Sequence, residues 1–474
     1  MAELLVSLPS WAAALLLFFA TVSGSTGPRS RENRGASRIP SQFSEEERVA
    51  IKEALKAFPT VFHSSLVQHE VVAKYSHLFT IQGSDPSLQP YMLMAHIDVV
   101  PAPEEGWEVP PFSGLERNGF IYGRGALDNK NSVMAILHAL ELLLIRNYSP
   151  KRSFFIALGH DEEVSGEKGA QKISALLQAR GVQLAFLVDE GSFILEGFIP
   201  NLEKLVAMIS VTEKGALDLM LQVNMTPGHS SAPPKETSIG ILSAAVSRLE
   251  QTPMPNMFGG GPLKKTMKLL ANEFSFPINI VLRNLWLFHP IVSRIMERNP
   301  ITNALVRTTT ALTMFNAGIK VNVIPPLAQA TINFRIHPSQ TVHEVLELVK
   351  NTVADDRVQL HVLRSFEPLP ISPSDDQAMG YQLLQETIRS VFPEVDIVVP
   401  GICIANTDTR HYVNITNGMY RFNPLPLNPQ DFSGVHGINE KVSVQNYQNQ
   451  VKFIFEFIQN ADTYKEPVPH LHEL

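Results

Sequence analysis

Short apolar segments alternate with helical segments over residues 91–189, and this alternation limits the possible folds more than any other feature. The pattern predicts strands at Tyr91–His96, Phe154–Gly159 and Leu184–Val188, and helices at Ser132–Ile145 and Ala170–Ala179. Strands separated by helices pair in parallel, and helices cover both faces of such a sheet. The sequence therefore predicts an α/β catalytic domain with a mostly parallel central sheet.

A second pattern interrupts this one between residues 207 and 367. It predicts an α+β domain, with strands Leu217–Val223 and Gln329–Ile336 and helices Ser238–Leu249 and Val342–Val353. The first pattern then returns in the segments Asp376–Val391, Val395–Val399 and Val444–Ile458. A chain of 474 residues exceeds the size of one hydrophobic core. We therefore predict a catalytic domain built from residues 43–206 and 368–474, with the second domain inserted between the two parts.

The N-terminus has the features of a secretory signal. An apolar stretch, Trp11–Ala20, precedes the small residues Ser23-Gly24-Ser25, which predicts a signal peptide at residues 1–25 and a flexible lead-in at residues 26–42. A retained signal anchor is the alternative, because the first residues include Glu3 and no lysine or arginine, but the apolar run is short for a membrane span. We expect a secreted protein without a stable transmembrane anchor.

Three glycosylation sequons, at Asn147, Asn224 and Asn414, become relevant in a secreted chain. The single cysteine, Cys403, excludes an intrachain disulfide. A net charge of -7 provides no basic surface for nucleic acid, so we expect no nucleic-acid partner.

Histidines and carboxylates gather where the predicted strands and turns end. The residues concerned are His96, Asp98, Asp128, Glu162, Glu163, Asp189 and His436. Ligand-binding side chains of open α/β sheets lie at the carboxyl ends of the strands. Taken singly, each residue has an ordinary interpretation as a structural histidine or a solvated loop. Together, with no cysteine ligand available, two histidines and three carboxylates suit a pair of zinc ions.

These motifs resemble those of the aminoacylase and carboxypeptidase-G type of two-zinc peptidases, from about Tyr91 to Asp462. The motifs are His96-Ile97-Asp98-Val99-Val100-Pro101, Gly123-Arg124-Gly125 with Asp128 and Lys130, Asp161-Glu162-Glu163, and Asn322-Val323-Ile324-Pro325. The resemblance implies two Zn²⁺ ions per subunit. It assigns His96 and Asp189 to one ion, Glu163 and His436 to the other, and Asp128 to both.

The resemblance also implies roles for residues that hold no metal. Asp98 orients His96, and Glu162 is the general base that later returns its proton to the leaving amine. The inserted domain forms a homodimer and supplies His229, which stabilises the oxyanion. Asn322, Arg335 and Arg410 bind the substrate, and the two arginines grip its carboxylate. The alternative for the arginines is an ordinary surface position.

An apolar insertion, Met254–Pro300, distinguishes the second domain from that of compact family members. Its Phe274-Ser275-Phe276 and Leu285-Trp286-Leu287-Phe288 form an enlarged lid, similar to that of secreted members acting on N-fatty-acyl amino acids. The implied reaction is hydrolysis to a fatty acid and an amino acid, together with the reverse condensation. We expect the insertion to contact a fatty-acyl chain or a lipid particle, the alternative being additional lid core or a dimer interface.

The N-terminal region departs from the family pattern. A predicted helix, Ser44–Lys56, runs directly into Ala57-Phe58-Pro59-Thr60-Val61, so roughly two dozen residues, one helix and its loop, are missing. Loss of a covering helix exposes side chains worth about 1.5–3 kcal/mol each, against a net stability of about 5–15 kcal/mol. Two alternatives stay open: a carboxypeptidase, dipeptidase or short-chain aminoacylase of the same family, and a secreted lipid-binding protein without activity.

Overall fold

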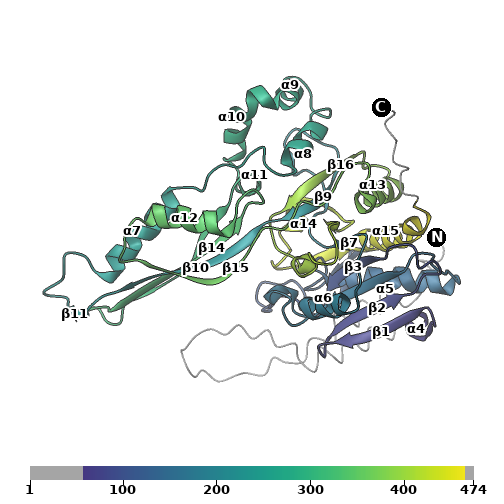
Figure 1. Ribbon diagram of the computed structural model, residues 1–474, viewed down its shortest axis with the longest axis horizontal. Helices are drawn as coiled ribbons and strands as arrows, with labels where there is room; N and C mark the ends of the chain where they lie inside the picture. The colour runs from purple at the N-terminus through teal and green to yellow at the C-terminus, as the bar shows by residue number, and fades with distance from the viewer. Residues whose placement is uncertain (1–56, 465–474) are drawn as a thin grey trace. The chain divides into compact units, whose positions relative to one another are not determined.

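The computed structural model describes residues 57–464, which form two compact units (Figure 1). Unit 1 contains the residues up to Ser210, Ser372–Val399 and those from Thr407 onward, and unit 2 contains Val211–Ile371 and Pro400–Asn406. Unit 2 therefore interrupts unit 1, with main limits four residues later than the expected 207 and 367. The strand β9 (Val206–Glu213) passes through the first limit without a break, so no change of pattern marks that limit in the sequence.

The centre of unit 1 is a sheet whose four middle strands are parallel. In spatial order they are β6 (Phe154–Gly159), β3 (Tyr91–His96), β7 (Leu187–Asp189) and β17 (Met419–Arg421). Antiparallel pairing adds further strands on both sides: β2 (Ser76–Ile81) and β1 (Val67–Val72) beyond β6, and β9 and β8 (Ile194–Leu195) beyond β17. β18 (Pro426–Leu427) pairs with β8, and β16 (Ile397–Cys403) pairs with β9. The middle strands confirm the predicted α/β class, while the antiparallel flanks were not predicted.

Helices cover both faces of this sheet, which explains why β3 and β6 are buried at every residue. On one face, Met92 and Met94 of β3 pack with Ile173 of α6 (Ala170–Ala179). On the other face, the ring of Tyr91 meets that of Phe457 edge to face. Phe457 belongs to α15 (Val444–Thr463), which packs against α5 (Lys130–Ile145) and α13 (Met379–Val391).

A small antiparallel sheet joins two distant parts of unit 1. It consists of β4 (Glu116–Arg117), β5 (Phe120–Tyr122) and β19 (Lys441–Ser443), in the order β19-β5-β4. Tyr122 at the end of β5 is paired with Lys441 at the start of β19. The turn after β5 and the segment before β19 are therefore neighbours, although more than 300 residues separate them. The short helix α14 (Pro429–Phe432) precedes that segment.

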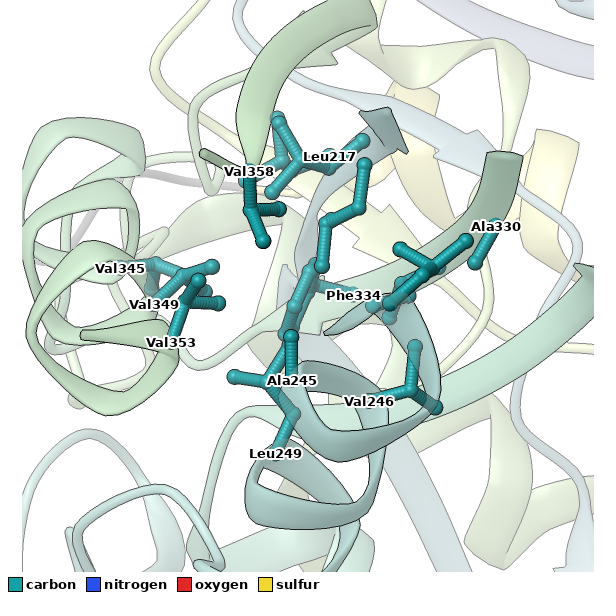
Figure 2. Packing of buried hydrophobic residues seen from close by; sticks show 14 of the residues in the cluster. Leu217, Ala245, Val246, Leu249, Ala330, Phe334, Val345, Val349, Val353 and Val358 are labelled. Atoms are coloured by element: carbon teal, nitrogen blue, oxygen red, sulfur yellow. The ribbon is translucent and has the colours of Figure 1, made fainter. Parts of the chain in front are cut away.

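Unit 2 is built on a four-stranded antiparallel sheet in the order β12 (Thr309–Ala317), β14 (Leu327–Ile336), β10 (Gly215–Asn224), β15 (Gln359–Phe366). Along β14, buried and partly buried residues alternate, as in a sheet with one covered face. Helices α7 (Ser238–Gln251) and α12 (Val342–Val353) supply Leu249 and Val349 to the core on that face (Figure 2). Beyond the Asn224–Leu327 end of the sheet, β11 (Gly228–His229) pairs with β13 (Val323–Ile324).

The apolar insertion, Met254–Pro300, contains three short helices within unit 2, and a fourth begins at its last residue. The three are α8 (Leu263–Leu270), α9 (Ile278–Arg283) and α10 (Leu285–Met296), and the fourth is α11 (Pro300–Val306). These helices share a small core that includes Leu263, Leu282, Leu285 and Val292. Part of the insertion is therefore lid core, which was the alternative to a lipid contact.

The expected signal peptide (1–25), lead-in (26–42) and helix Ser44–Lys56 lie outside the described residues. The first described helix is α4 (Pro59–His63), whose amides of Thr60 and Val61 donate to the buried carboxylate of Glu141 at 3.0 and 2.8 Å. Within residues 57–464, no helix combines the length and the apolar character needed to cross a bilayer.

Candidate metal centre and active site

The ionisable residues of unit 1 gather at the carboxyl ends of three neighbouring parallel strands. β3 ends on His96, β7 ends on Asp189, and β6 leads into the 3-10 helix η1 (Glu162–Val164). The strand order β6-β3-β7 places the acidic segments after β6 and β7 on either side of His96. This edge is where open α/β sheets bind their ligands.

Two clusters of metal-ligand type share one carboxylate, that of Asp128. In the first, His96 Nε2 lies 2.9 Å from Asp128 Oδ1 and 3.1 Å from Glu190 Oε1. In the second, His436 Nε2 lies 3.0 Å from Asp128 Oδ2 and 3.3 Å from Glu163 Oε2. Each oxygen of Asp128 thus faces a different cluster, which is the arrangement of a carboxylate that bridges two cations.

The donor atoms of both clusters fit a divalent metal. Imidazole nitrogens and carboxylate oxygens are the ligands of hydrolytic zinc sites. Glu163 Oε1 is buried without a hydrogen-bond partner, which would be costly unless a cation satisfies it. Among the described residues, these two clusters are the groups of three or more potential ligands whose atoms lie within 4.8 Å of one another.

Glu190, rather than Asp189, lies beside His96 and Asp128 in the structure, so it is the candidate ligand here, and the Asp189 assignment from the family resemblance stays a prediction. Asp189 is the last residue of β7, and its Oδ1 accepts a hydrogen bond from the Glu190 amide at 2.9 Å. The chain leaves the strand at this point, so the alternation of side chains along a strand does not decide between two adjacent acids. No signal in the sequence favours Glu190.

The turn that carries Asp128 depends on Gly125. Its φ of +90° lies in a region that side-chain-bearing residues rarely adopt, and a Cβ there would approach Val99 Cγ1 at 2.9 Å. Gly125, the second glycine of the Gly123-Arg124-Gly125 motif, is therefore required by the backbone conformation of this turn.

The clustered carboxylates control the charge of the two histidines. Burial alone would lower the pKa of His96, but Glu190, Asp128 and Asp98 together raise it well above its usual value. Hydrogen bonds to Asp128 and Glu163 raise the pKa of His436 to about 10. The carboxylates thus favour positive charge at both imidazoles, and a bound cation would displace the protons that supply it.

Asp98 contacts both the histidine of β3 and the acidic loop after β6. His96 Nδ1 lies 3.0 Å from the Asp98 carbonyl and 3.4 Å from its carboxylate. The amides of Glu162 and Glu163 donate to the two carboxylate oxygens of Asp98 at 3.1 and 3.2 Å. The predicted orienting role thus extends from His96 to the loop that carries Glu162.

Glu162 has the environment of a proton carrier. Burial raises the pKa of its carboxyl well above the usual value, and Asp408 and Glu190 act in the same direction, while His96 and Arg410 oppose them. Arg410 Nη2 lies 3.6 Å from Glu162 Oε1. A buried carboxyl of this kind can hold a proton near neutral pH and release it during a reaction.

Three of the predicted residues, His229, Asn322 and Arg335, belong to unit 2, where they occupy opposite ends of the sheet. His229 is exposed in β11, beside Asn322, whose carbonyl accepts from the Ser230 amide at 3.2 Å. Arg335 lies near the other end of β14 and donates to Asn406 Oδ1. Eight residues of strand between Leu327 and Arg335 correspond to about 26 Å. One copy of unit 2 therefore cannot offer His229 and Arg335 to the same small molecule.

The asparagines of the three sequons, Asn147, Asn224 and Asn414, are all exposed. Asn224 donates to Gln359 Oε1 at 3.3 Å. Their modification stays a prediction.

Glu440 is a further residue that the sequence did not predict, a fully buried acid whose carboxylate accepts hydrogen bonds from the turn that carries Asp128. Its one sequence signal is weak, an acid four residues after His436.

A family model for the peptidase family M20/M25/M40 matches residues 92–460. The chain belongs to this family. Two solved structures support the fold: an M20 metallo-carboxypeptidase from Sulfolobus solfataricus (TM-score 0.67, 17% identity, 96% of this chain and 100% of that one) and human carnosine dipeptidase 1 (TM-score 0.64, 17% identity, 98% of each chain). M20 metallopeptidases depend on metal, and the two clusters at Asp128 are the candidate positions for it here.

Full-length M20 relatives are much more similar in sequence. N-fatty-acyl-amino acid synthase/hydrolase PM20D1 of Mus musculus is 93% identical, and that of Homo sapiens is 67% identical, both over 100% of each chain. Probable carboxypeptidase S-like 2 of Dictyostelium discoideum is 42% identical over 89% of this chain and 80% of its own length. These relationships make the chain an amidohydrolase of the M20 family.

The alignment with the mouse protein also bears on the length of the chain. It spans 503 positions, whereas the chain has 474 residues, so at least 29 positions are gaps in this chain. A shorter chain is what the sequence predicted, and the position of the missing residues before Ala57 stays a prediction.

Proposed function

We propose that this chain hydrolyses N-fatty-acyl amino acids to a fatty acid and an amino acid, and that it catalyses the reverse condensation. The observation that carries this proposal is the 93% identity, over the full length of both chains, with the mouse protein that bears the name of this activity. The orthologous proteins of cattle and human, at 71% and 67% identity, bear the same name. Asp128 supports the proposal because its two carboxylate oxygens face two candidate metal clusters, and a metal ion can activate both an amide carbonyl and a water molecule.

We propose further that the two clusters hold two Zn²⁺ ions per subunit. His96 and Glu190 belong to one site, Glu163 and His436 to the other, and Asp128 to both. Bound zinc would act as a Lewis acid that polarises the amide carbonyl, and it would lower the pKa of a coordinated water. Three hydrogen bonds of Asp98, to His96 and to the amides of Glu162 and Glu163, hold parts of both sites in place.

In this proposal Glu162 moves the proton. Its carboxylate takes a proton from the attacking water and delivers it to the amine when the amide bond breaks. The high pKa that burial gives to Glu162 suits the second step, because the carboxyl retains the proton until the amine accepts it. In condensation the same group removes a proton from the attacking amine and delivers it to the hydroxyl oxygen of the fatty acid, which leaves as water.

In a homodimer, His229 of one copy would be able to approach Arg335 of the other copy. Because about 26 Å of strand lies between the two ends of β14, we propose that one substrate meets Arg335 of one copy and His229 with Asn322 of another. The exposed position of His229 supports a role at a surface that a second copy can reach. Arg335 and Arg410 keep their proposed role in binding the substrate carboxylate.

The outer surface of the insertion supports a lipid partner. Phe276, Trp286, Leu287, Ile291 and Ile295 are all exposed, with Trp286 at 80%. Monomeric proteins rarely expose so many neighbouring large apolar side chains. Basic residues accompany them: Lys264, Lys265, Lys268, Arg283, Arg294 and Arg298. We propose that this surface meets the acyl chain of the substrate, including substrate carried in a lipid particle.

Secretion and glycosylation remain part of the proposal and rest on the sequence of residues 1–25 and on the three sequons. Both are tested by expression in mammalian cells, with N-terminal sequencing of the protein in the medium and treatment with a glycosidase. Retention of the whole protein in the membrane fraction would favour the signal anchor instead.

The adjacent acids Glu162 and Glu163 provide a matched test of the reaction. We expect Glu162→Gln to keep two zinc ions per chain and to lose turnover in both directions by about 10²–10⁴-fold, because the proton carrier is gone. Glu163→Gln should lose metal as well as turnover. The measurements are zinc content by atomic emission, and hydrolysis and condensation rates on long-chain acyl amino acids, with a dipeptide as comparison substrate. Glu162→Gln with normal turnover would remove it from the mechanism, and preferred cleavage of the dipeptide would favour a dipeptidase.

A further inference from the structure

Glu440 has four hydrogen-bond donors around its carboxylate and no contact with solvent. Oε1 accepts from the amides of Leu127 at 2.7 Å and Asp128 at 3.1 Å. Oε2 accepts from the Gly125 amide at 3.2 Å and from Arg124 Nη1 at 2.6 Å. Three backbone donors from one turn thus converge on a single side chain. That turn carries the carboxylate shared by both clusters.

Arg124 connects the same carboxylate to the second histidine. While Nη1 binds Glu440, Nη2 donates to the Gly437 carbonyl at 2.7 Å. The preceding residue, His436, has a φ of 57°, in the left-handed region that residues with a Cβ rarely adopt. The guanidinium is 3% exposed and lies over the ring of Trp107, 5.4 Å from its centroid. A buried, fork-shaped cation therefore holds the backbone on which His436 depends.

We propose that Glu440 and Arg124 are positioning residues that set the spacing of the two metal clusters by fixing Asp128 and His436 together. The inference rests on the proposed function, because it takes the clusters to be metal sites. It goes beyond that function by naming residues that touch neither metal nor substrate.

A carboxylate is required at this position because all four donors need acceptors. Glutamine offers one oxygen and one NH₂ group. If its oxygen faces Leu127 and Asp128, the NH₂ group faces the arginine and the link to His436 is lost. If its oxygen faces Arg124, the NH₂ group opposes the Asp128 amide. Glu440→Gln therefore disturbs a ligand in either orientation, although its shape is almost unchanged.

The chain contains a matched control for a purely structural effect. Glu141 is also a buried carboxylate of unit 1 that accepts two backbone amides, those of Thr60 and Val61. Its hydrogen bonds hold α4 against α5 and involve no residue of either metal cluster. Glu141→Gln removes a similar interaction, and any loss of metal affinity that follows from reduced stability alone should appear in both variants.

The experiment is a titration of metal-free, full-length protein with Zn²⁺ in competition with a fluorescent chelator, together with thermal unfolding. Changes to residues that orient metal ligands typically lower metal affinity by about 10–100-fold. We expect Glu440→Gln to weaken both sites within this range, and Glu141→Gln to leave both affinities within about twofold of wild type. Arg124→Lys keeps the charge but cannot reach both partners as a fork, so it should weaken mainly the site that contains His436.

The outcomes separate the inference from the proposed function. Wild type that binds no zinc refutes the metal clusters and the inference with them. Wild type with two sites and Glu440→Gln with unchanged affinities refutes the positioning role alone. Equal weakening in Glu440→Gln and Glu141→Gln refutes it too, because the effect would then be general. If Glu440→Gln does not fold, Arg124→Lys decides: equal affinity to wild type at the His436 site overturns the proposal.

Discussion

The helix α10 offers a test of the lipid contact, because its apolar residues divide between two faces. Phe288 packs against the small core of the insertion, whereas Trp286 and Ile291 are 80% and 56% exposed. Sequence alone groups Trp286 with Phe288, and the structure separates them. The informative comparison is therefore Trp286→Ser with Ile291→Ser on the outer face, against Phe288→Ser on the inner face.

The expected magnitudes differ between the two faces. An exposed side chain contributes little to folding, so the outer-face variant should change stability by no more than about 0.5 kcal/mol per residue. If it loses contact with three or four methylenes of an acyl chain, at about 0.8 kcal/mol each, the barrier for a long-chain substrate rises by about 2.4–3.2 kcal/mol. That corresponds to a decrease of roughly fifty- to two-hundredfold in kcat/KM. Phe288→Ser should instead reduce stability by about 1.5–2.5 kcal/mol, half the value for a fully buried phenylalanine.

The assay is kcat/KM for a long-chain and a short-chain acyl group on the same amino acid, in variants whose folding and oligomeric state match wild type. The outer-face variant should lose activity on the long chain and keep it on the short chain. An equal loss on both substrates, or no loss on either, would refute the contact between this face and the acyl chain, and the insertion would then serve as lid structure.

Three further predictions follow from individual residues. Glu190→Gln should lower zinc content by about one ion per chain, whereas Asp189→Asn should retain both ions; the reverse result in metal analysis would support the assignment from family resemblance. Burial lowers the pKa of Lys214 to about 7, and Arg335 adds to this effect. The unfolded chain therefore binds more protons than the native state between pH 7 and 10.5, so stability should rise with pH across that range, and Lys214→Met should flatten the rise in thermal unfolding curves; parallel curves would exclude Lys214 as its source. Inserting the additional residues of the mouse protein at the predicted position before Ala57 should raise the melting temperature and the yield of folded protein, and an unchanged melting temperature would contradict the predicted loss of a covering helix.

Local signals explain the elements that the sequence predicts to the residue. The helix α12 begins at Val342 because Thr341 and Glu344 form a capping box, which is visible in the sequence as Thr-x-x-Glu. The predicted limits of α6 are also those of the structure. The strand expected at Leu184–Val188 is in fact Leu187–Asp189, and the residues before it are buried without belonging to the strand: Leu184 lies in the core beside α6, and the ring of Phe186 stacks on that of Tyr91. Burial is thus predictable there, while hydrogen-bond pairing is not.

The residues of the candidate site also divide into those that the sequence predicts and those that it does not. Side chains whose proposed role depends on their own chemistry, such as His96 and Glu162, stand in motifs that a single sequence reveals. Side chains that act on the backbone of other segments leave no such trace, because an amide donor has no sequence identity. Asp98 was predicted through its contact with a histidine two residues away, but its bonds to the amides of Glu162 and Glu163 could not be predicted.

Glu440 shows why this loss of information is greatest at a metal centre. Glu440 and its partner Arg124 lie 316 positions apart in the sequence, and they meet because β5 pairs with β19. In the proposed metal centre Asp128 must be placed relative to two clusters at once, and a turn fixed only by its own sequence would leave that placement to loop motion. Glu440 accepts from three backbone amides of the turn that carries Asp128, and Arg124 donates to the carbonyl of the residue after His436. Their buried ion pair therefore restricts this motion. If the proposal holds, the placement of the candidate ligands depends on a long-range strand pairing as well as on the motifs that contain them.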